Sequence, residues 1–157
     1  MDNSKEKTTE LLTEVLKTAR PSEVDAILER FAAKLSDEDG AFQSYVRALF
    51  RQKGLRQQDI FLMADIPERY GYKLISGEKT TQRRDILLRI FLASGFSLDE
   101  VQHALRLYGM PMLYPRFPRD AVLMIAINTE IRDPYDADEL LTKHGMEPLT
   151  PCGSYEK

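Results

Sequence analysis

Basic side chains are concentrated in the middle of this 157-residue chain. Residues 43–89 hold ten Lys and Arg against five Asp and Glu, a balance of +5, whereas residues 1–42 and residues 90–157 each have a balance of −4. Lysine and arginine attract phosphate, and because this attraction is local, a net charge of −3 does not oppose nucleic-acid binding. The alternative is an uneven surface charge without a ligand. The ten basic residues are Arg47, Arg51, Lys53, Arg56, Arg69, Lys73, Lys79, Arg83, Arg84 and Arg89.

The residue types that most often carry catalysis or bind metals are few and scattered. The histidines are His103 and His144, and the single cysteine is Cys152. They form no cluster with metal-ligand spacing, and no sequence neighbour of Cys152 would activate its thiol. The acidic run from Asp133 to Glu139 lacks the glycine and spacing of a calcium loop. We therefore expect no enzyme activity, no bound metal and no cofactor.

The composition is that of an ordinary water-soluble globular protein, with 43% apolar and 30% charged residues. No run of apolar residues is long enough to span a bilayer, and the charged N-terminus lacks the apolar core of a secretory signal. One cysteine cannot form an internal disulfide. These features favour a cytoplasmic protein without a membrane partner.

Almost every segment has the apolar spacing of an amphipathic helix, which predicts an all-α fold. Residues 1–40 are expected to be an N-terminal helical extension. Its first helix carries Leu11, Leu12, Val15 and Leu16 and ends before Pro21, and its second runs over Ser22–Leu35 with Ser22 as the N-cap. A flexible tail is expected at residues 152–157.

Residues 41–96 are expected to form a domain of short helices. The first has Phe42, Tyr45, Val46, Leu49 and Phe50 on one face and ends at Lys53-Gly54. The second covers Gln57–Met63, with Ile60 and either Leu62 or Met63 turned inward. After a turn at Ala64–Ile66, Pro67 is expected to open a third helix that ends at Ser76-Gly77. Thr80 or Thr81 would cap a fourth helix that ends at Gly95.

Two short helices with a three-residue turn between them have the helix-turn-helix spacing. Four segments in order resemble the lambda-repressor-like (XRE-type) DNA-binding domain: KGLRQQDI at Lys53–Ile60, the turn residue Ile66, LISGEK at Leu74–Lys79, and FSLDE at Phe96–Glu100. The resemblance implies a five-helix phage-repressor-like domain over residues 41–96, with the third helix in the major groove of double-stranded DNA.

The resemblance also implies roles for particular residues. Gln57 would contact a phosphate beside the free N–H groups that open the second helix. The outward face of the third helix would contact base edges, sugars and thymine methyl groups through Glu68, Arg69, Tyr70, Tyr72 and Lys73. Lys79 and Arg83 would hold the DNA backbone without reading sequence.

Two residues depart from the family pattern. Arg56 replaces the usual Ser or Thr N-cap of the second helix, which removes about 1 kcal/mol of capping energy. Gly71 lies inside the third helix, where glycine costs about 1 kcal/mol relative to alanine. Gly71 has two interpretations: close approach, to DNA or to the second helix, or a third helix that no longer binds DNA tightly.

The C-terminal half contains an internal repeat. Leu105, Gly109, Met110, Leu113 and Pro115 recur 36 residues later, from Leu141 to Pro151, and Arg84-Asp85 recurs 35 residues later as Arg119-Asp120. Each copy is expected to be a helical hairpin, with helices over Ile86–Ala93 and Leu98–Leu107 and then over Ala121–Asn128 and Tyr135–Lys143. Residues 97–151 would thus continue the core of the preceding domain. The segment YGMPMLYPRFPRD also resembles bacterial XRE-type regulators with an appended helical tail.

The expected function is a sequence-specific transcriptional regulator that binds an inverted repeat as a homodimer. The dimer surface would be either the N-terminal helices or the C-terminal hairpins. The alternative is a protein-interaction adaptor, antitoxin-like or an inhibitor, with its partner on the hairpins. Exposure of Arg69, Tyr70 and Lys73 on one basic face favours DNA, and their burial in an interface favours the adaptor.

Overall fold

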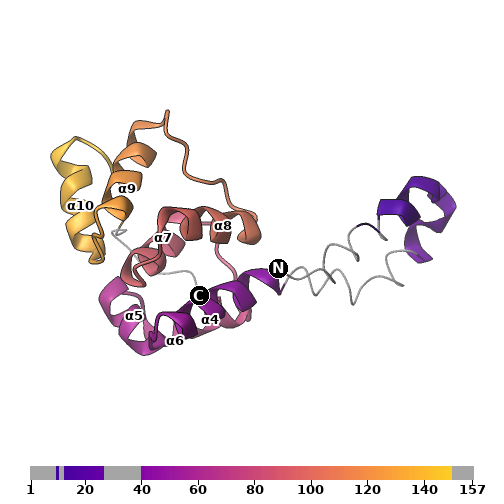
Figure 1. Cartoon of the computed structure of the whole chain (residues 1–157), viewed down its shortest axis with the longest axis horizontal. Helices are drawn as coiled ribbons and strands as arrows, with labels where there is room; N and C mark the ends of the chain where they lie inside the picture. The colour runs from indigo at the N-terminus through magenta and orange to yellow at the C-terminus, as the bar shows by residue number, and fades with distance from the viewer. Residues whose placement is uncertain (1–9, 11–12, 27–39, 150–157) are drawn as a thin grey trace. The chain divides into compact units, whose positions relative to one another are not determined.

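The computed structural model describes residues 10, 13–26 and 40–149 (Figure 1). Its contacts divide the chain between Asp39 and Gly40. In the N-terminal unit, residues 13–18 are helical and Pro21–Glu23 form the 3₁₀ turn η1. Ser22 lies inside this turn and not at its N-cap, which is Arg20. Because the fixed φ of Pro21 suits a first helical position, the turn begins one residue before Ser22. Most of the predicted helix at residues 22–35, and the predicted tail with Cys152, lie outside the described residues.

Residues 40–149 are folded into α-helices, and no strand occurs among the residues that the structure describes, which confirms the all-α prediction at that level. The helices are α4 (Ala41–Gln52), α5 (Gln57–Ala64), α6 (Glu68–Ser76), α7 (Arg84–Ala93), α8 (Leu98–Tyr108), α9 (Pro118–Asn128) and α10 (Pro134–Lys143). Residues 41–96 therefore hold four helices, α4 to α7, and not the five that the resemblance implied.

Helix α7 is the centre of the core. Every residue from Ile86 to Ala93 is buried, and α5, α8 and α10 pack against this helix. Neither Thr80 nor Thr81 caps it, because α7 begins at Arg84 with Arg83 as its N-cap. Thr81 is instead held in the preceding loop, where its N–H donates to the Tyr108 hydroxyl at 2.7 Å and its own hydroxyl accepts from the Arg83 N–H.

Helices α5 and α6 form a pair joined by Asp65, Ile66 and Pro67. Asp65 takes the left-handed conformation (φ 55°, ψ 48°), and Pro67 is the N-cap of α6 and not its first residue. The inward residues of α5 are Ile60, Phe61 and Ala64. The expectation that Leu62 or Met63 turns inward is wrong: Leu62 is 81% exposed. Packing of α5 against both α7 and α6 selects the face that carries Phe61.

The glycine inside α6 allows this pair to pack closely. A Cβ atom on Gly71 would lie 2.6 Å from the Phe61 ring, well inside van der Waals contact. Gly71 is itself buried. Of the interpretations left open by the sequence, close approach to the preceding helix is therefore the one that the structure supports.

The sequence repeat corresponds to two helical hairpins, α7–α8 and α9–α10. In the first, the Gln102 side chain donates to the carbonyl of the buried Leu113 and accepts from its N–H. In the second, Asp138, which is 36 residues after Gln102, accepts from the N–H of the buried Leu149. The first helix of each hairpin ends with a hydrogen bond from a backbone N–H to the carbonyl five residues earlier. These bonds run from Phe96 to Phe91 and, 35 residues later, from Ile131 to Ala126. The next N-caps, Ser97 and Asp133, are 36 apart, which identifies Arg132 as the inserted residue.

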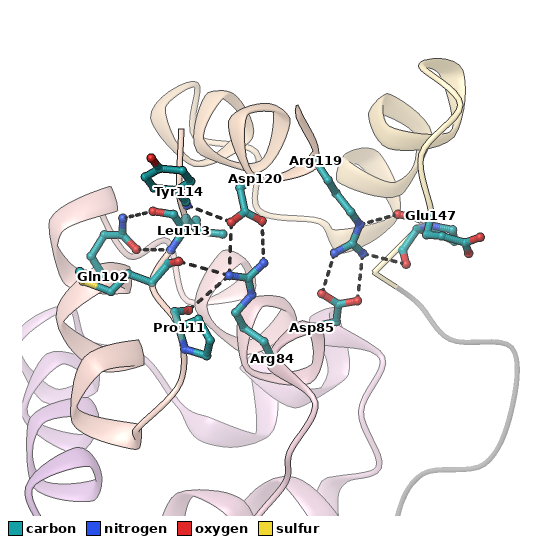
Figure 2. A network of polar contacts seen from close by, with 11 residues as sticks. Arg84, Asp85, Gln102, Pro111, Leu113, Tyr114, Arg119, Asp120 and Glu147 are labelled. Atoms are coloured by element: carbon teal, nitrogen blue, oxygen red, sulfur yellow. Dashed lines mark hydrogen bonds and ion pairs between the residues drawn. The ribbon is translucent and has the colours of Figure 1, made fainter. Parts of the chain in front are cut away.

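Two ion pairs connect the hairpins at the starts of their first helices, α7 and α9 (Figure 2). Arg84 Nη2 lies 2.6 Å from Asp120 Oδ1, and Arg119 Nη2 lies 2.9 Å from Asp85 Oδ2. Each arginine also donates to carbonyls of its own copy, Arg84 to residues 111 and 112 and Arg119 to residues 147 and 148. The repeated Arg-Asp pair thus joins the two copies reciprocally.

Candidate nucleic-acid interface

The outer face of α6 carries most of the predicted contact residues. Glu68, Arg69 and Tyr72 are exposed, and Lys73 is half-buried. Tyr70 is not on this face: it is 7% exposed and belongs to the core. The inward face of α6 consists of Tyr70, Gly71, Leu74 and Ile75. Since Tyr70 is one helical turn from Leu74, the same apolar contacts that hold Leu74 also bury the tyrosine ring.

A basic pocket of about 390 Å³ lies beside this face, at the N-terminus of α5. Its walls come from the end of α4, the start of α5 and the middle of α6. The residues that line it are Arg47, Phe50, Arg51, Leu55, Arg56, Gln57, Gln58 and Tyr72. Three guanidinium groups and two amides therefore share one opening, and we call these residues the α5 pocket.

The backbone at the N-terminus of α5 adds to the positive charge of the α5 pocket. Its N-cap, Arg56, is extended and makes no capping hydrogen bond with its side chain. The first N–H groups of the helix thus receive no capping acceptor from it, and together with the helix dipole they favour an anion. Arg56 lies 3.7 Å from Asp59 and 3.4 Å from the Gln58 amide oxygen, both at the surface. Arg56 therefore forms no capping hydrogen bond with its side chain, but it places a positive charge beside backbone N–H groups that favour phosphate.

Tyr72 connects the α5 pocket to the α6 face. Its ring packs edge-on against Phe61 with 5.2 Å between the centroids. Desolvation, together with the neighbouring Glu68 carboxylate, raises the pKa of Tyr72 above its ordinary value. The hydrogen bond between the Tyr72 hydroxyl and the Glu68 carboxylate contributes to this rise in the pKa.

Lys79 and Arg83 lie in or at the end of the α6–α7 loop and do not line the α5 pocket. Both are half-buried. The Lys79 N–H donates to the Lys73 carbonyl at 3.0 Å, after Gly77 has ended α6 with a left-handed residue. The loop is thereby folded back on the end of α6, which keeps Lys79 close to the face of that helix.

Arg47 and Arg51 are site residues that motif comparison missed. They are one turn apart on α4, both are exposed, and both line the α5 pocket. Their i, i+4 spacing on the polar side of an amphipathic helix was visible in the sequence. What the sequence could not indicate is that this side of α4 faces the start of α5.

Three of the ten central basic residues have internal roles. Lys53 pairs with Glu100 at 3.0 Å, Arg84 with Asp120, and the fully buried Arg89 donates to backbone carbonyls. The charge that can face a ligand is carried by the other seven: Arg47, Arg51, Arg56, Arg69, Lys73, Lys79 and Arg83.

No family model matches this chain, and searches of curated proteins and of solved structures also gave no match. Across residues 10, 13–26 and 40–149, no helix has the length and apolar character to cross a bilayer, and no group of three or more His, Cys, Asp or Glu is placed to hold a metal ion.

Proposed function

We propose that this protein is a sequence-specific DNA-binding regulator in which α5 and α6 act as a helix-turn-helix within a phage-repressor-like domain. The observation that carries the proposal is the α5 pocket, a basic opening at a helix N-terminus that adjoins the exposed face of a second short helix. A backbone phosphate has the charge and the acceptor geometry that this opening favours.

In this arrangement the phosphate would fix the register of α6 on the duplex. Arg47, Arg51 and Gln57 would contact the backbone, while Arg69 and Glu68 would meet base edges in the major groove. A bidentate contact from Arg69 to guanine would contribute about 1–3 kcal/mol of discrimination. One such unit reads a short site, so we propose binding to an inverted repeat by two copies of the chain.

The test begins with selection of bound sequences from a random duplex pool. Affinity for a selected duplex is then measured across a salt series for the wild type, Arg51→Ala, Arg69→Ala and an exposed control, Arg116→Ala. Arg51→Ala should weaken binding to all sequences and reduce the slope of log affinity against log salt by about one. Arg69→Ala should weaken binding about 5–150-fold and relax preference at one position. Failure to select any sequence, or equal affinities for all four proteins, would contradict the proposal.

A protein-binding adaptor is the second candidate, and one surface feature favours it. Met112, Tyr114 and Phe117 are all exposed in the loop between α8 and α9, and the Tyr114 and Phe117 rings pack edge to face with centroids 5.0 Å apart. Exposed aromatic side chains of this kind are common in protein interfaces. If the protein is an adaptor, substitution of Phe117 by Ser should abolish capture of its protein partner. If the protein is a DNA-binding regulator, the same substitution should leave its affinity for the duplex unchanged.

A further inference from the structure

The turn between α5 and α6 is held from two sides by side chains that come from other helices. Arg89 of α7 donates through Nη2 to the Ala64 carbonyl at 2.6 Å and to the Asp65 carbonyl at 2.7 Å. The Tyr135 hydroxyl, at the start of α10, donates to the Asp65 carboxylate. We call Arg89 and Tyr135, with their contacts to residues 64 and 65, the turn clamp.

The burial of Arg89 shows that its position is a specific one. The side chain is 0% exposed, and a guanidinium removed from water is strongly destabilising unless hydrogen bonds and opposite charge compensate. Its acceptors are carbonyls at the C-terminal end of α5, where the helix dipole is negative. The charge is therefore placed where it can hold the end of α5.

The repeat indicates that neither member of the turn clamp is part of the pattern shared by the two hairpins. The counterpart of Arg89 in the second hairpin, 35 residues later, is Met124, and the counterpart of Tyr135 in the first, 36 residues earlier, is Asp99. Both copies fold into the same hairpin with these unlike residues. Arg89 and Tyr135 are thus not part of what the two copies share, and both side chains contact the α5–α6 turn.

Geometry at this turn controls the direction of α6. Asp65 is a non-glycine residue with φ of 55°, a conformation that needs support from its surroundings, and only Ile66 and Pro67 separate it from α6. Gly71 lies against Phe61, so the helices are close enough for a small change in the turn to alter their contact. A shift there would move Arg69 and Tyr72 of α6 relative to the arginines of the α5 pocket.

We propose that Arg89 and Tyr135 are positioning residues for DNA recognition, and that through Tyr135 the second hairpin sets the orientation of α6 on the duplex. This inference rests on the proposed function. It assigns to the C-terminal hairpin a direct part in specificity, although none of its side chains needs to touch DNA.

Tyr135→Phe tests the proposal, because it removes only the hydroxyl from a residue at the surface. The matched control is Tyr114→Phe, another exposed tyrosine, whose ring packs on Phe117. Affinity is measured for a selected duplex and for a scrambled one. Tyr135→Phe should weaken binding to the selected duplex roughly threefold to tenfold, with scrambled-duplex affinity unchanged, so that the ratio of the two falls. The control should leave both affinities unchanged.

Asp65→Asn and the double variant complete a cycle. If the two side chains act through one contact, the loss in the double variant should be no larger than the larger single loss. A specificity ratio within a factor of two of the wild type in Tyr135→Phe overturns the proposal. So does an equal loss on both duplexes, since that is the result of a purely structural role.

Hydrogen exchange separates failure of this inference from failure of the proposed function. In Tyr135→Phe, the amides of α6 should exchange faster while those of α8 are unchanged. If Tyr135→Phe speeds exchange in α6 but the wild-type protein binds no duplex, the result supports the turn clamp and overturns DNA binding. Unchanged exchange in α6 would overturn the clamp even where the wild type binds DNA.

Discussion

The Glu100 carboxylate belongs to two interactions at once. It completes a capping box with Ser97 at the start of α8, where it accepts from the Ser97 N–H at 2.8 Å, and it pairs with Lys53 at the end of α4. Burial of the carboxyl tends to raise its pKa, but the hydrogen bonds from Ser97 and Lys53 outweigh that effect. The pKa of Glu100 is consequently lower than its ordinary value.

A lowered pKa in the folded state stabilises the protein in a defined pH range. The stabilisation is complete above the pKa of an unfolded glutamate, about 4.3, and is lost as pH falls through the folded pKa. We expect Glu100→Gln to reduce the free energy of unfolding by about 1 kcal/mol at pH 7, and by progressively less as the pH is lowered below 4. Urea unfolding of both proteins at several pH values measures this, with Glu139→Gln on the exposed face of α10 as control. A difference that is constant with pH would contradict the assignment.

Gly71 allows a second test at the residue scale. In an open helix, Gly71→Ala would stabilise by about 1 kcal/mol. Here the added methyl group would overlap the Phe61 ring, so we expect a net loss of about 1–3 kcal/mol. Thermal unfolding provides the measurement, and Ser44→Ala on exposed α4 is the control. Combining Gly71→Ala with Phe61→Leu should recover part of the loss. Stabilisation by Gly71→Ala alone would show that α5 and α6 are not in close contact.

At the element scale, the sequence predicts helices well and contacts between them poorly. Apolar spacing indicated every helix from α4 to α10, and glycines marked the ends of α4, α6 and α8 because left-handed residues follow there. Tyr70 was misplaced because an aromatic hydroxyl suits both a core and a groove. On α5, Ile60 was correctly placed inward, but Phe61 was missed because the inward face depends on two neighbouring helices whose positions periodicity does not encode.

The Arg-Asp repeat illustrates the same limit. The recurrence of Arg84-Asp85 as Arg119-Asp120 was evident in the sequence. The sequence does not indicate, however, that each arginine pairs with the aspartate of the other copy. That pairing follows from the way the two hairpins meet at the first turns of α7 and α9 (Figure 2).

The crossed pairs differ in burial, and this gives a prediction with an internal control. Asp120 is 2% exposed and also accepts from the Tyr114 N–H, whereas the side chain of Asp85 is 30% exposed. We expect Asp120→Ala to cost about 3 kcal/mol, because Arg84 is left without its carboxylate in a half-buried site. Asp85→Ala should cost about 1 kcal/mol or less. Chemical denaturation compares the two variants, and equal losses would mean that burial does not distinguish the pairs.

At the scale of the whole molecule, α7 is both the last helix of the proposed DNA-binding domain and the first helix of the repeat. The residues from Ile86 to Ala93 are buried by α5 on one side and by α8 and α10 on others, so the proposed domain and the repeat share one core. Removal of residues 97–149 would expose much of this apolar surface and would also delete Asp120 and Arg119, the ion-pair partners of Arg84 and Asp85.

We therefore expect a fragment of residues 40–96 not to fold by itself. Its helices should give weak circular dichroism and no cooperative thermal transition, because helices this short depend on tertiary packing. A fragment of residues 40–149 should unfold cooperatively, since it retains both hairpins and the crossed ion pairs. Addition of a selected duplex should raise the melting temperature of the longer fragment and have no effect on the shorter one. Cooperative folding of residues 40–96 would show that the DNA-binding unit does not need the repeat, and that α7 is adequately covered by α4, α5 and α6 alone.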